Sequence, residues 1–217
     1  MKVFVIHYKK MLARKANILR QFERFGITDY EFIDIDRSEI HKYDVRKIDC
    51  LIPPAWVAVA LSHIYAYKEI AEKYNEALIL EDDAIMSDDF MESYAQYREE
   101  LSSEKYFDML FLGDGCGLHI PKDKLVPNKH IYYKCLEPTR WGGDGVTRCV
   151  DSYIVSKNCA RKLCDYIEKI DNNNLINKEV DWWLNKVARE MNLVVYWAEP
   201  TIVTQSSANL LLDKRCY

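Results

Sequence analysis

The chain has 217 residues and a formal net charge of −4, and hydrophobic and charged residues make up 49% and 29% of it. These values are typical of a globular domain with a sizeable core, and they predict one domain over residues 1–217. The mildly acidic balance argues against nucleic acid as the main partner.

Two further features bear on localisation. The apolar run inside the N-terminal segment MKVFVIHYKK is much shorter than a signal-peptide core, and no window reaches the apolar length of a transmembrane helix. The seven cysteines are an odd number without a CxxC pair, which favours reduced thiols over disulfides or a zinc site. The sequence therefore predicts a cytoplasmic protein without a transmembrane segment, and it leaves peripheral attachment to a membrane open.

Strands and helices alternate along the first half of the chain. The predicted strands are Lys2–Ile6, Tyr30–Ile35 and Ala77–Asp82, and the predicted helices between them are Lys9–Phe25 and Ala55–Lys73. Gly26 is a C-terminal stop for the first helix, and Pro53 and Pro54 suit the opening of the second. The helical spacing directs Leu12 and Tyr65 toward the core.

The second half continues with both kinds of element. We expect a helix capped by Ser87 and Asp88 that runs through Leu101, a helix capped by Ser156 that runs through Ile167, and a helix over Glu179–Met191. The expected strands are Phe107–Leu112, Val150–Val155, Leu193–Trp197 and the extended piece Thr201–Thr204. Between them, Gly113–Arg148 holds six of the seven glycines, which predicts a functional loop or lid at about 113–148.

This order of elements predicts an α/β fold with a Rossmann-type, mostly parallel sheet and helices on both faces. Ligands of such sheets bind outside the carboxyl ends of the strands. Glu81, Asp82 and Asp83 follow the apolar run Ala77–Leu80 at such an end. The two-residue period of a strand directs Glu81 and Asp83 to one side and Asp82 to the other. This pair suits Mn²⁺ or Mg²⁺ holding phosphates, although the triplet alone fits a solvated acidic turn equally well.

Several enzyme classes lack their motifs here. The sequence contains no GxGxxG after its first strand, no GxxxxGK[ST] and no GxSxG. A phosphoacceptor receiver domain would place the acidic cluster after its first strand, whereas here the cluster follows the third. A carboxylate pair that holds a metal ion against a diphosphate occurs in many nucleotide-sugar glycosyltransferases, and Glu81-x-Asp83 is a variant of their DxD pattern.

The chain as a whole resembles glycosyltransferase family 25, the lipopolysaccharide and collagen β-galactosyltransferase group. The similar segments lie in order over nearly the whole chain: Val3–Arg14 (VFVIHYKKMLAR), Ala60–His63 (ALSH), Leu78–Asp83 (LILEDD), Phe107–Gly113 (FDMLFLG), Tyr153–Leu163 (YIVSKNCARKL), Val180–Leu184, Pro200 and Gln205. The resemblance implies a GT-A fold, a nucleotide-sugar donor, often UDP-galactose, and an inverting reaction. The chain departs from the family pattern at His7, where asparagine is usual, and at Ala58 and Val59, where Gly-Cys is usual.

Residue roles follow from the acidic triplet and from this resemblance. Asp83, with Glu81, is the candidate metal ligand set. The candidate donor-binding residues are His7, Lys10, Arg14, Ser62, His63, Asp82 and Gln205. The alternatives are a solvated helix face for the basic residues and a buried, hydrogen-bonded structural role for His63.

Inverting transfer needs a general base that accepts the proton of the attacking hydroxyl. Asp181 is the first candidate and Asp151 the second. Trp182 and Trp183 are candidates for stacking on an acceptor sugar, and Asp114 and Asp144 for lining the acceptor side. The alternative makes Asp181 a helix-start carboxylate and places the tryptophans in the core.

We therefore predict an inverting, metal-dependent glycosyltransferase that moves a hexose, galactose or glucose, from a UDP-sugar to a glycan or glycoprotein acceptor. The alternative is a catalytically silent relative that keeps the fold as a module binding sugar nucleotides or a protein.

Overall fold

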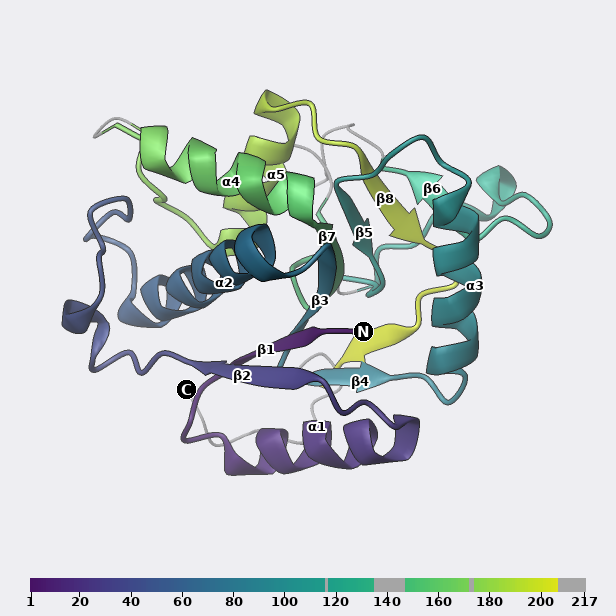
Figure 1. The fold of residues 1–217 in the computed structure, drawn as a ribbon, viewed down its shortest axis with the longest axis horizontal. Coiled ribbons are helices and arrows are strands. Elements are labelled where there is room, and N and C mark those ends of the chain that lie inside the picture. Colours follow the sequence, from purple (N-terminus) through teal and green to yellow (C-terminus); the bar gives the residue numbers. More distant parts are fainter. Residues whose placement is uncertain (116, 135–146, 172–173, 207–217) are drawn as a thin grey trace.

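The computed structural model describes residues 1–115, 117–134, 147–171 and 174–206. A seven-stranded sheet in the order β2-β1-β3-β7-β5-β8-β6 crosses the molecule (Figure 1). Its strands are β1 (Val3–His7), β2 (Tyr30–Asp34), β3 (Glu76–Glu81), β5 (Met109–Phe111), β6 (Ile131–Tyr133), β7 (Ser152–Ser156) and β8 (Val195–Ala198). Strands β2, β1, β3, β5 and β8 share one direction, whereas β7 and β6 run against it. The predicted mostly parallel sheet is confirmed.

Helices cover both faces of this sheet, as predicted. They are α1 (Leu12–Phe25), α2 (Pro54–Lys73), α3 (Phe90–Ser102), α4 (Lys157–Lys169) and α5 (Val180–Glu190), and two short 3₁₀ helices are η1 (Ile40–Lys42) and η2 (Lys122–Lys124). Helices α1 and α3 pack on one face, and α2, α4 and α5 pack on the other (Figure 1). Successive residues of β1 feed the two cores alternately, Val3 and Val5 on one side and Phe4 and Ile6 on the other.

The order of the first three strands creates the place for a ligand. The chain leaves β1 through α1 to reach β2 on one side, and returns through α2 to reach β3 on the other side. Because α1 and α2 lie on opposite faces, the carboxyl ends of β1 and β3 are left open between them. His7 ends β1 and Glu81 ends β3.

Several element boundaries differ from the predictions. Ala84–Met86 forms strand β4, which pairs antiparallel with β9 (Val203–Gln205) in a separate two-stranded sheet. This distant partner extends the chain beyond the acidic triplet, so α3 begins later than predicted, with Asp89 as its N-cap. Leu12 is 71% exposed and Tyr65 42% exposed, so neither side chain reaches the core. The caps at Gly26 and Ser156 are confirmed: Gly26 has φ 65°, and Ser156 Oγ accepts a hydrogen bond from the Cys159 amide.

The predicted glycine-rich loop contains η2 and β6, and residues 116 and 135–146 within it lie outside the described residues. Its first part approaches the segment before β7 closely. A Cβ atom at Gly113 would lie 2.2 Å from Asp151 Oδ1, and one at Gly115 (φ 50°) would lie 2.1 Å from Arg148 Cα. Glycine is therefore required at Gly115, where the clash is with backbone and φ is positive, whereas a side chain at Gly113 would force the buried Asp151 carboxyl to move. Among the described residues, no helix is long and apolar enough to cross a membrane.

Candidate active site

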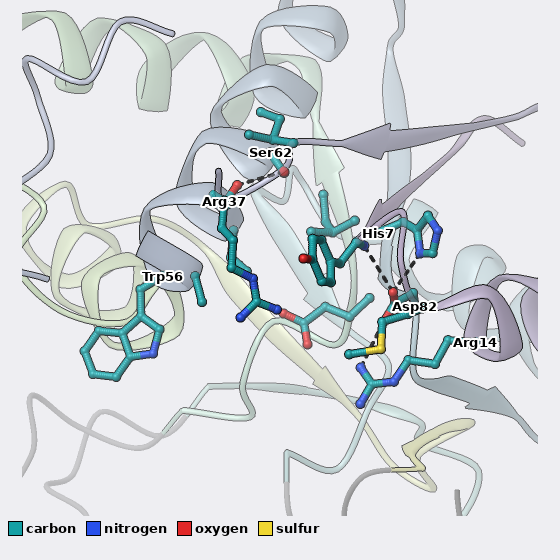
Figure 2. A pocket seen from close by; sticks show the side chains of 14 residues that line it. His7, Arg14, Arg37, Trp56, Ser62 and Asp82 are labelled. Atoms are coloured by element: carbon teal, nitrogen blue, oxygen red, sulfur yellow. Dashed lines mark hydrogen bonds and ion pairs between the residues drawn. The ribbon is translucent and has the colours of Figure 1, made fainter. Parts of the chain in front are cut away.

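A cavity of about 560 Å³ opens at the carboxyl ends of β1 and β3, and we call it the main cavity (Figure 2). Its polar and aromatic lining consists of His7, Tyr8, Arg14, Arg37, Trp56, Ser62, Glu81 and Asp82. Arg14 and Trp56 lie on opposite sides of it (Figure 2). A hollow of this size with two guanidinium groups and two carboxylates suits a charged small molecule.

Asp82 ties together the elements on one side of the main cavity. Its Oδ2 lies 2.8 Å from His7 Nδ1 and accepts a hydrogen bond from the Tyr8 amide at 3.3 Å, and its Oδ1 accepts one from Arg14 Nη1 at 3.0 Å (Figure 2). The ion pair and the backbone contact fix the turn from β1 into α1 against the end of β3. Asp82 thereby holds Arg14 at the cavity wall.

A second cavity of about 230 Å³ adjoins the first, and we call it the side cavity. Its lining consists of Trp56, Val59, Glu81, Cys149, Val150, Glu179, Val180, Asp181 and Gln205. Trp56, Val59 and Glu81 line both cavities. The end of β3 therefore lies where the two cavities meet. Asp181 lines the side cavity, and Arg14 lines the main cavity.

The carboxylates around this junction disfavour one another's ionisation. Burial raises the pKa of Glu81 well above its ordinary value, and the neighbouring carboxylates of Asp83 and Asp151 raise it further. Burial raises the pKa of Asp151 to about 7 against a lowering hydrogen bond from Ser152. Burial also raises the pKa of Asp181. Positive charge brought to this place would lower the cost of ionising these groups.

The two predicted metal ligands do not occupy equivalent positions. Glu81 keeps 26% of its side chain exposed, whereas Asp83 is buried in the turn after β3 and lies in the lining of neither cavity. Asp83 Oδ2 lies 3.8 Å from Arg14 Nη1, and the Asp83 carbonyl accepts a hydrogen bond from the Ser206 amide at 2.9 Å.

Within 1–115, 117–134, 147–171 and 174–206, no three histidine, cysteine, aspartate or glutamate side chains form a group that could hold a metal ion. Mg²⁺ in proteins is commonly bound through only one or two carboxylates together with substrate phosphates. The crowded carboxylates of Glu81 and Asp83 fit that donor chemistry, since a cation would relieve their mutual repulsion.

The predicted donor-binding residues are distributed unevenly. His7, Arg14, Ser62 and Asp82 line the main cavity, and Gln205 lines the side cavity. Ser62 Oγ donates to the Ala58 carbonyl at 2.8 Å, and Lys10 is exposed outside the cavity lining.

His63 is fully buried beside the end of β3. Its Nδ1 lies 2.7 Å from the Tyr153 hydroxyl, which lies 2.8 Å from the Tyr67 hydroxyl. Burial lowers the pKa of His63 to about 3, so the imidazole is neutral near pH 7. Its Nε2 lies 4.0 Å from Glu81 Oε1. His63, predicted as a donor-binding residue, therefore lies in the lining of neither cavity and is hydrogen-bonded within the core.

Of the predicted catalytic and acceptor residues, only some lie at a cavity. Asp181 lines the side cavity, whereas Asp151 has no exposed surface and packs beneath Gly113. Trp183 is buried in the core and its ring contacts Tyr166, while Trp182 is half-buried and lies in the lining of neither cavity.

Asp114, a further predicted acceptor residue, lies in the lining of neither cavity. Asp114 is half-buried and close enough to Asp151 for its charge to raise the pKa of that group. Asp144 lies outside the described residues.

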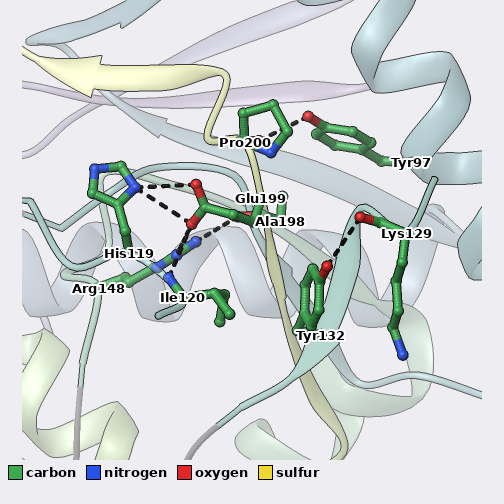
Figure 3. A network of polar contacts seen from close by, with 9 residues as sticks. All are labelled: Tyr97, His119, Ile120, Lys129, Tyr132, Arg148, Ala198, Glu199 and Pro200. Atoms are coloured by element: carbon green, nitrogen blue, oxygen red, sulfur yellow. Dashed lines mark hydrogen bonds and ion pairs between the residues drawn. The ribbon is translucent and has the colours of Figure 1, made fainter. Parts of the chain in front are cut away.

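A buried ion pair holds the backbone that leads into β7 (Figure 3). Arg148 Nη1 donates to the Ala198 carbonyl at 2.6 Å, and its Nη2 donates to Glu199 Oε2 at 2.8 Å. Glu199 also contacts His119 Nδ1 at 3.1 Å and accepts the Ile120 amide at 3.1 Å. The network joins the glycine-rich loop to the end of β8. It thereby holds the backbone that leads from Arg148 into β7, which lies beside the side cavity.

The cavity walls include polar and aromatic residues that the sequence did not single out, among them Tyr8, Arg37, Trp56 and Glu179. Arg37 follows β2, and its guanidinium lies 4.3 Å from the centre of the Tyr8 ring. Trp56 lies in the first turn of α2 and is 37% exposed. Two features of the sequence could have indicated Arg37 and Trp56. Arg37 is a positive charge just after a parallel strand, and Trp56 comes just after Pro53 and Pro54. Both positions lie at the carboxyl edge of the sheet, where ligands bind.

Two solved structures are similar to this chain at low sequence identity. Mouse xyloside xylosyltransferase 1 in its apo form is similar with a TM-score of 0.41 and 7% identity, over 89% of this chain and 69% of that one. S. aureus TarS 1–349 in complex with UDP-GlcNAc is similar with a TM-score of 0.40 and 12% identity, over 94% of this chain and 58% of that one.

A search of curated proteins found no match. The model of glycosyltransferase family 25 (LPS biosynthesis protein) matches residues 1–182, which is most of the chain and includes both cavity-forming strands, β1 and β3. This match confirms the predicted family, and with it glycosyl transfer as the class of activity. The chain therefore belongs to glycosyltransferase family 25.

Proposed function

We propose that this glycosyltransferase moves a hexose, galactose or glucose, from a UDP-sugar to a glycan or glycoprotein acceptor, with inversion at the anomeric carbon and with a divalent cation. One observation carries the proposal: the two cavities meet at Glu81, with Arg14 and Arg37 on one side and Asp181 on the other. A donor and an acceptor placed in the two cavities would meet at the end of β3.

The main cavity suits the nucleoside diphosphate part of the donor. Arg14 and Arg37 can donate to phosphate oxygens, and the ion pair with Asp82 keeps Arg14 in place. Glu81 and Asp83 would hold Mn²⁺ or Mg²⁺, which when bound neutralises charge on the leaving diphosphate.

The side cavity suits the acceptor, and Asp181 supplies its base. The acceptor hydroxyl oxygen attacks the anomeric carbon, the bond from that carbon to the diphosphate oxygen breaks, and its electron pair leaves with UDP. The hydroxyl proton passes to the Asp181 carboxylate, because this group lines the same cavity. Burial raises the pKa of Asp181, which makes its ionised form a stronger base than an exposed aspartate.

A donor panel with a matched pair of variants tests the base. Wild type, Asp181→Asn and the control Asp165→Asn, which changes an exposed acid on α4, are compared for transfer and for hydrolysis of UDP-galactose and UDP-glucose with Mn²⁺. We expect Asp181→Asn to reduce turnover about 10²–10⁴-fold while donor affinity stays within about twofold. Lost donor affinity with unchanged turnover at saturation would contradict the assignment.

The metal assignment is tested by thermal shift in Mn²⁺, Mg²⁺ or chelator. We expect UDP-sugar to raise the melting temperature only with a cation, and Asp83→Ala to remove that response. Asp88→Ala, a change at a side chain that is 91% exposed, is the control. A wild-type protein that binds UDP-sugar but neither transfers nor hydrolyses it would favour the silent binding module instead.

A further inference from the structure

Trp56 stands at the boundary between the two cavities. It lies in the first turn of α2, directly after Pro53–Pro54 and Ala55, and 37% of its surface is exposed. Together with Val59 and Glu81 it lines both the main and the side cavity. The indole is thus a large aromatic surface at the junction, and packing in the core does not account for its position.

The side cavity combines the surfaces that a sugar ring requires. Trp56 and Val59 form an apolar wall, and Glu179, Asp181 and Gln205 bring two carboxylates and an amide to the same space of about 230 Å³. A pyranose presents C–H groups on its faces and hydroxyl groups around its edge. Aromatic rings pack against such apolar faces, while carboxylates and amides bond to hydroxyl groups.

We propose that Trp56 is the platform on which the acceptor's pyranose ring stacks, so that Trp56 selects the acceptor. This inference rests on the proposed function, and it assigns the stacking role to Trp56 in place of Trp182 and Trp183. A ring on the indole faces Asp181 within one cavity, which directs a hydroxyl group toward the base. Tyr8, whose ring centre lies 4.3 Å from the Arg37 guanidinium, lines the main cavity and not the side cavity, so it is an aromatic residue on the donor side alone.

The test separates the aromatic face from simple apolar bulk. Trp56→Phe keeps a ring, Trp56→Leu keeps apolar volume without a ring, and Trp56→Ala removes both. The probes are methyl β-D-galactopyranoside and methyl β-D-glucopyranoside, titrated by NMR with and without UDP and Mn²⁺, and UDP alone, titrated by calorimetry. Tyr106→Ala, a change at a ring that is 50% exposed on the loop before β5, is the control for loss of an exposed aromatic residue.

We expect Trp56→Leu and Trp56→Ala to weaken binding of a methyl hexoside about tenfold and Trp56→Phe to weaken it about threefold or less, with UDP affinity within about twofold throughout. Hexoside affinity that is unchanged in Trp56→Ala, or hexoside binding that is absent from the wild type, would overturn the proposal. A loss of UDP affinity as large as the loss of hexoside affinity would overturn it as well, and would assign Trp56 to the donor.

The two proposals fail in distinguishable ways. Transfer from UDP-hexose with an acceptor KM that is unchanged in Trp56→Ala refutes the platform and leaves the proposed function standing. Hexoside binding that depends on Trp56, in a protein that neither binds nor hydrolyses a UDP-sugar, refutes the proposed donor and supports the platform.

Discussion

The buried carboxyl of Asp151 makes the stability of this protein depend on pH. Asp151 precedes β7 and has no exposed surface. Its Oδ1 accepts a hydrogen bond from Ser152 Oγ at 3.0 Å, and its Oδ2 has no hydrogen-bond partner within the described parts of the chain. Burial, with the charges of Asp114 and Asp83, raises its pKa from 3.8 to about 7. We predict that Asp151→Asn flattens the dependence of stability on pH.

The size and sign of the effect follow from proton linkage. Below about pH 4 the carboxyl of Asp151 is protonated in both the folded and the unfolded state, so its ionisation does not change the free energy of unfolding. Between about pH 4 and pH 7 the unfolded chain loses this proton while the folded protein keeps it, so the free energy of unfolding falls as pH rises. At about 1.4 kcal/mol per pKa unit, the loss above pH 7 is about 4 kcal/mol.

The substitution retains the shape of the side chain and removes this titration. An asparagine amide at the position of Oδ2 would lack an acceptor among the described residues, which costs about 1–3 kcal/mol at every pH. We therefore expect Asp151→Asn to lie within about 1 kcal/mol of the wild type near pH 5 and to be more stable than it by about 1–3 kcal/mol near pH 8.

Urea unfolding from pH 5 to pH 8.5 in the presence of a chelator measures both contributions: the pH-dependent loss from ionising Asp151 and the constant cost of the unpaired asparagine amide. The quantity to compare is the difference in free energy of unfolding between variant and wild type at each pH, with the exposed Asp165→Asn as the control. A difference that stays constant across this range would show that Asp151 ionises normally in the folded protein and would refute the reasoning.

Two further predictions concern close packing and buried hydroxyl groups. Gly115→Ala should cost at least about 2 kcal/mol more than Gly117→Ala in urea unfolding, because both glycines have positive φ but only the first would press a Cβ atom against the Arg148 backbone. Tyr153→Phe should cost about 1–3 kcal/mol, because it removes the hydroxyl between two buried polar partners, and Tyr65→Phe, at an exposed ring, should cost little. Equal losses within either pair would contradict these predictions.

The sequence by itself determined the α-helices, all strands of the central sheet except β6, and the edge of the sheet that carries the site. Apolar runs such as Ala77–Leu80 and the helical spacing of α2 are local signals, and local signals suffice to distinguish strand from helix. Alternation of these elements implies a mostly parallel sheet, and that sheet places the ends of β1 and β3 together. His7, Arg14, Glu81 and Asp82 could for this reason be named before the fold was known.

Tertiary structure alone decided which of the candidate side chains face a ligand space. Strand β4 exists because Ala84–Met86 pairs with Val203–Gln205, a partner more than a hundred residues away, and no local pattern announces that pairing. The turn before β4 buries Asp83 and leaves Glu81 at the junction of the cavities. A two-residue strand period could not predict this difference, because the strand ends at Glu81.

The aromatic residues show the same limit. Trp182 and Trp183 stand next to Asp181 in the sequence, yet Trp183 turns into the core with α5, while Trp56 reaches the cavities from α2. Sequence neighbours on a helix point about 100° apart, so adjacency to a candidate base does not bring a ring to its substrate. Side chains meet in a site through the packing of distant elements, and only the folded chain specifies that packing.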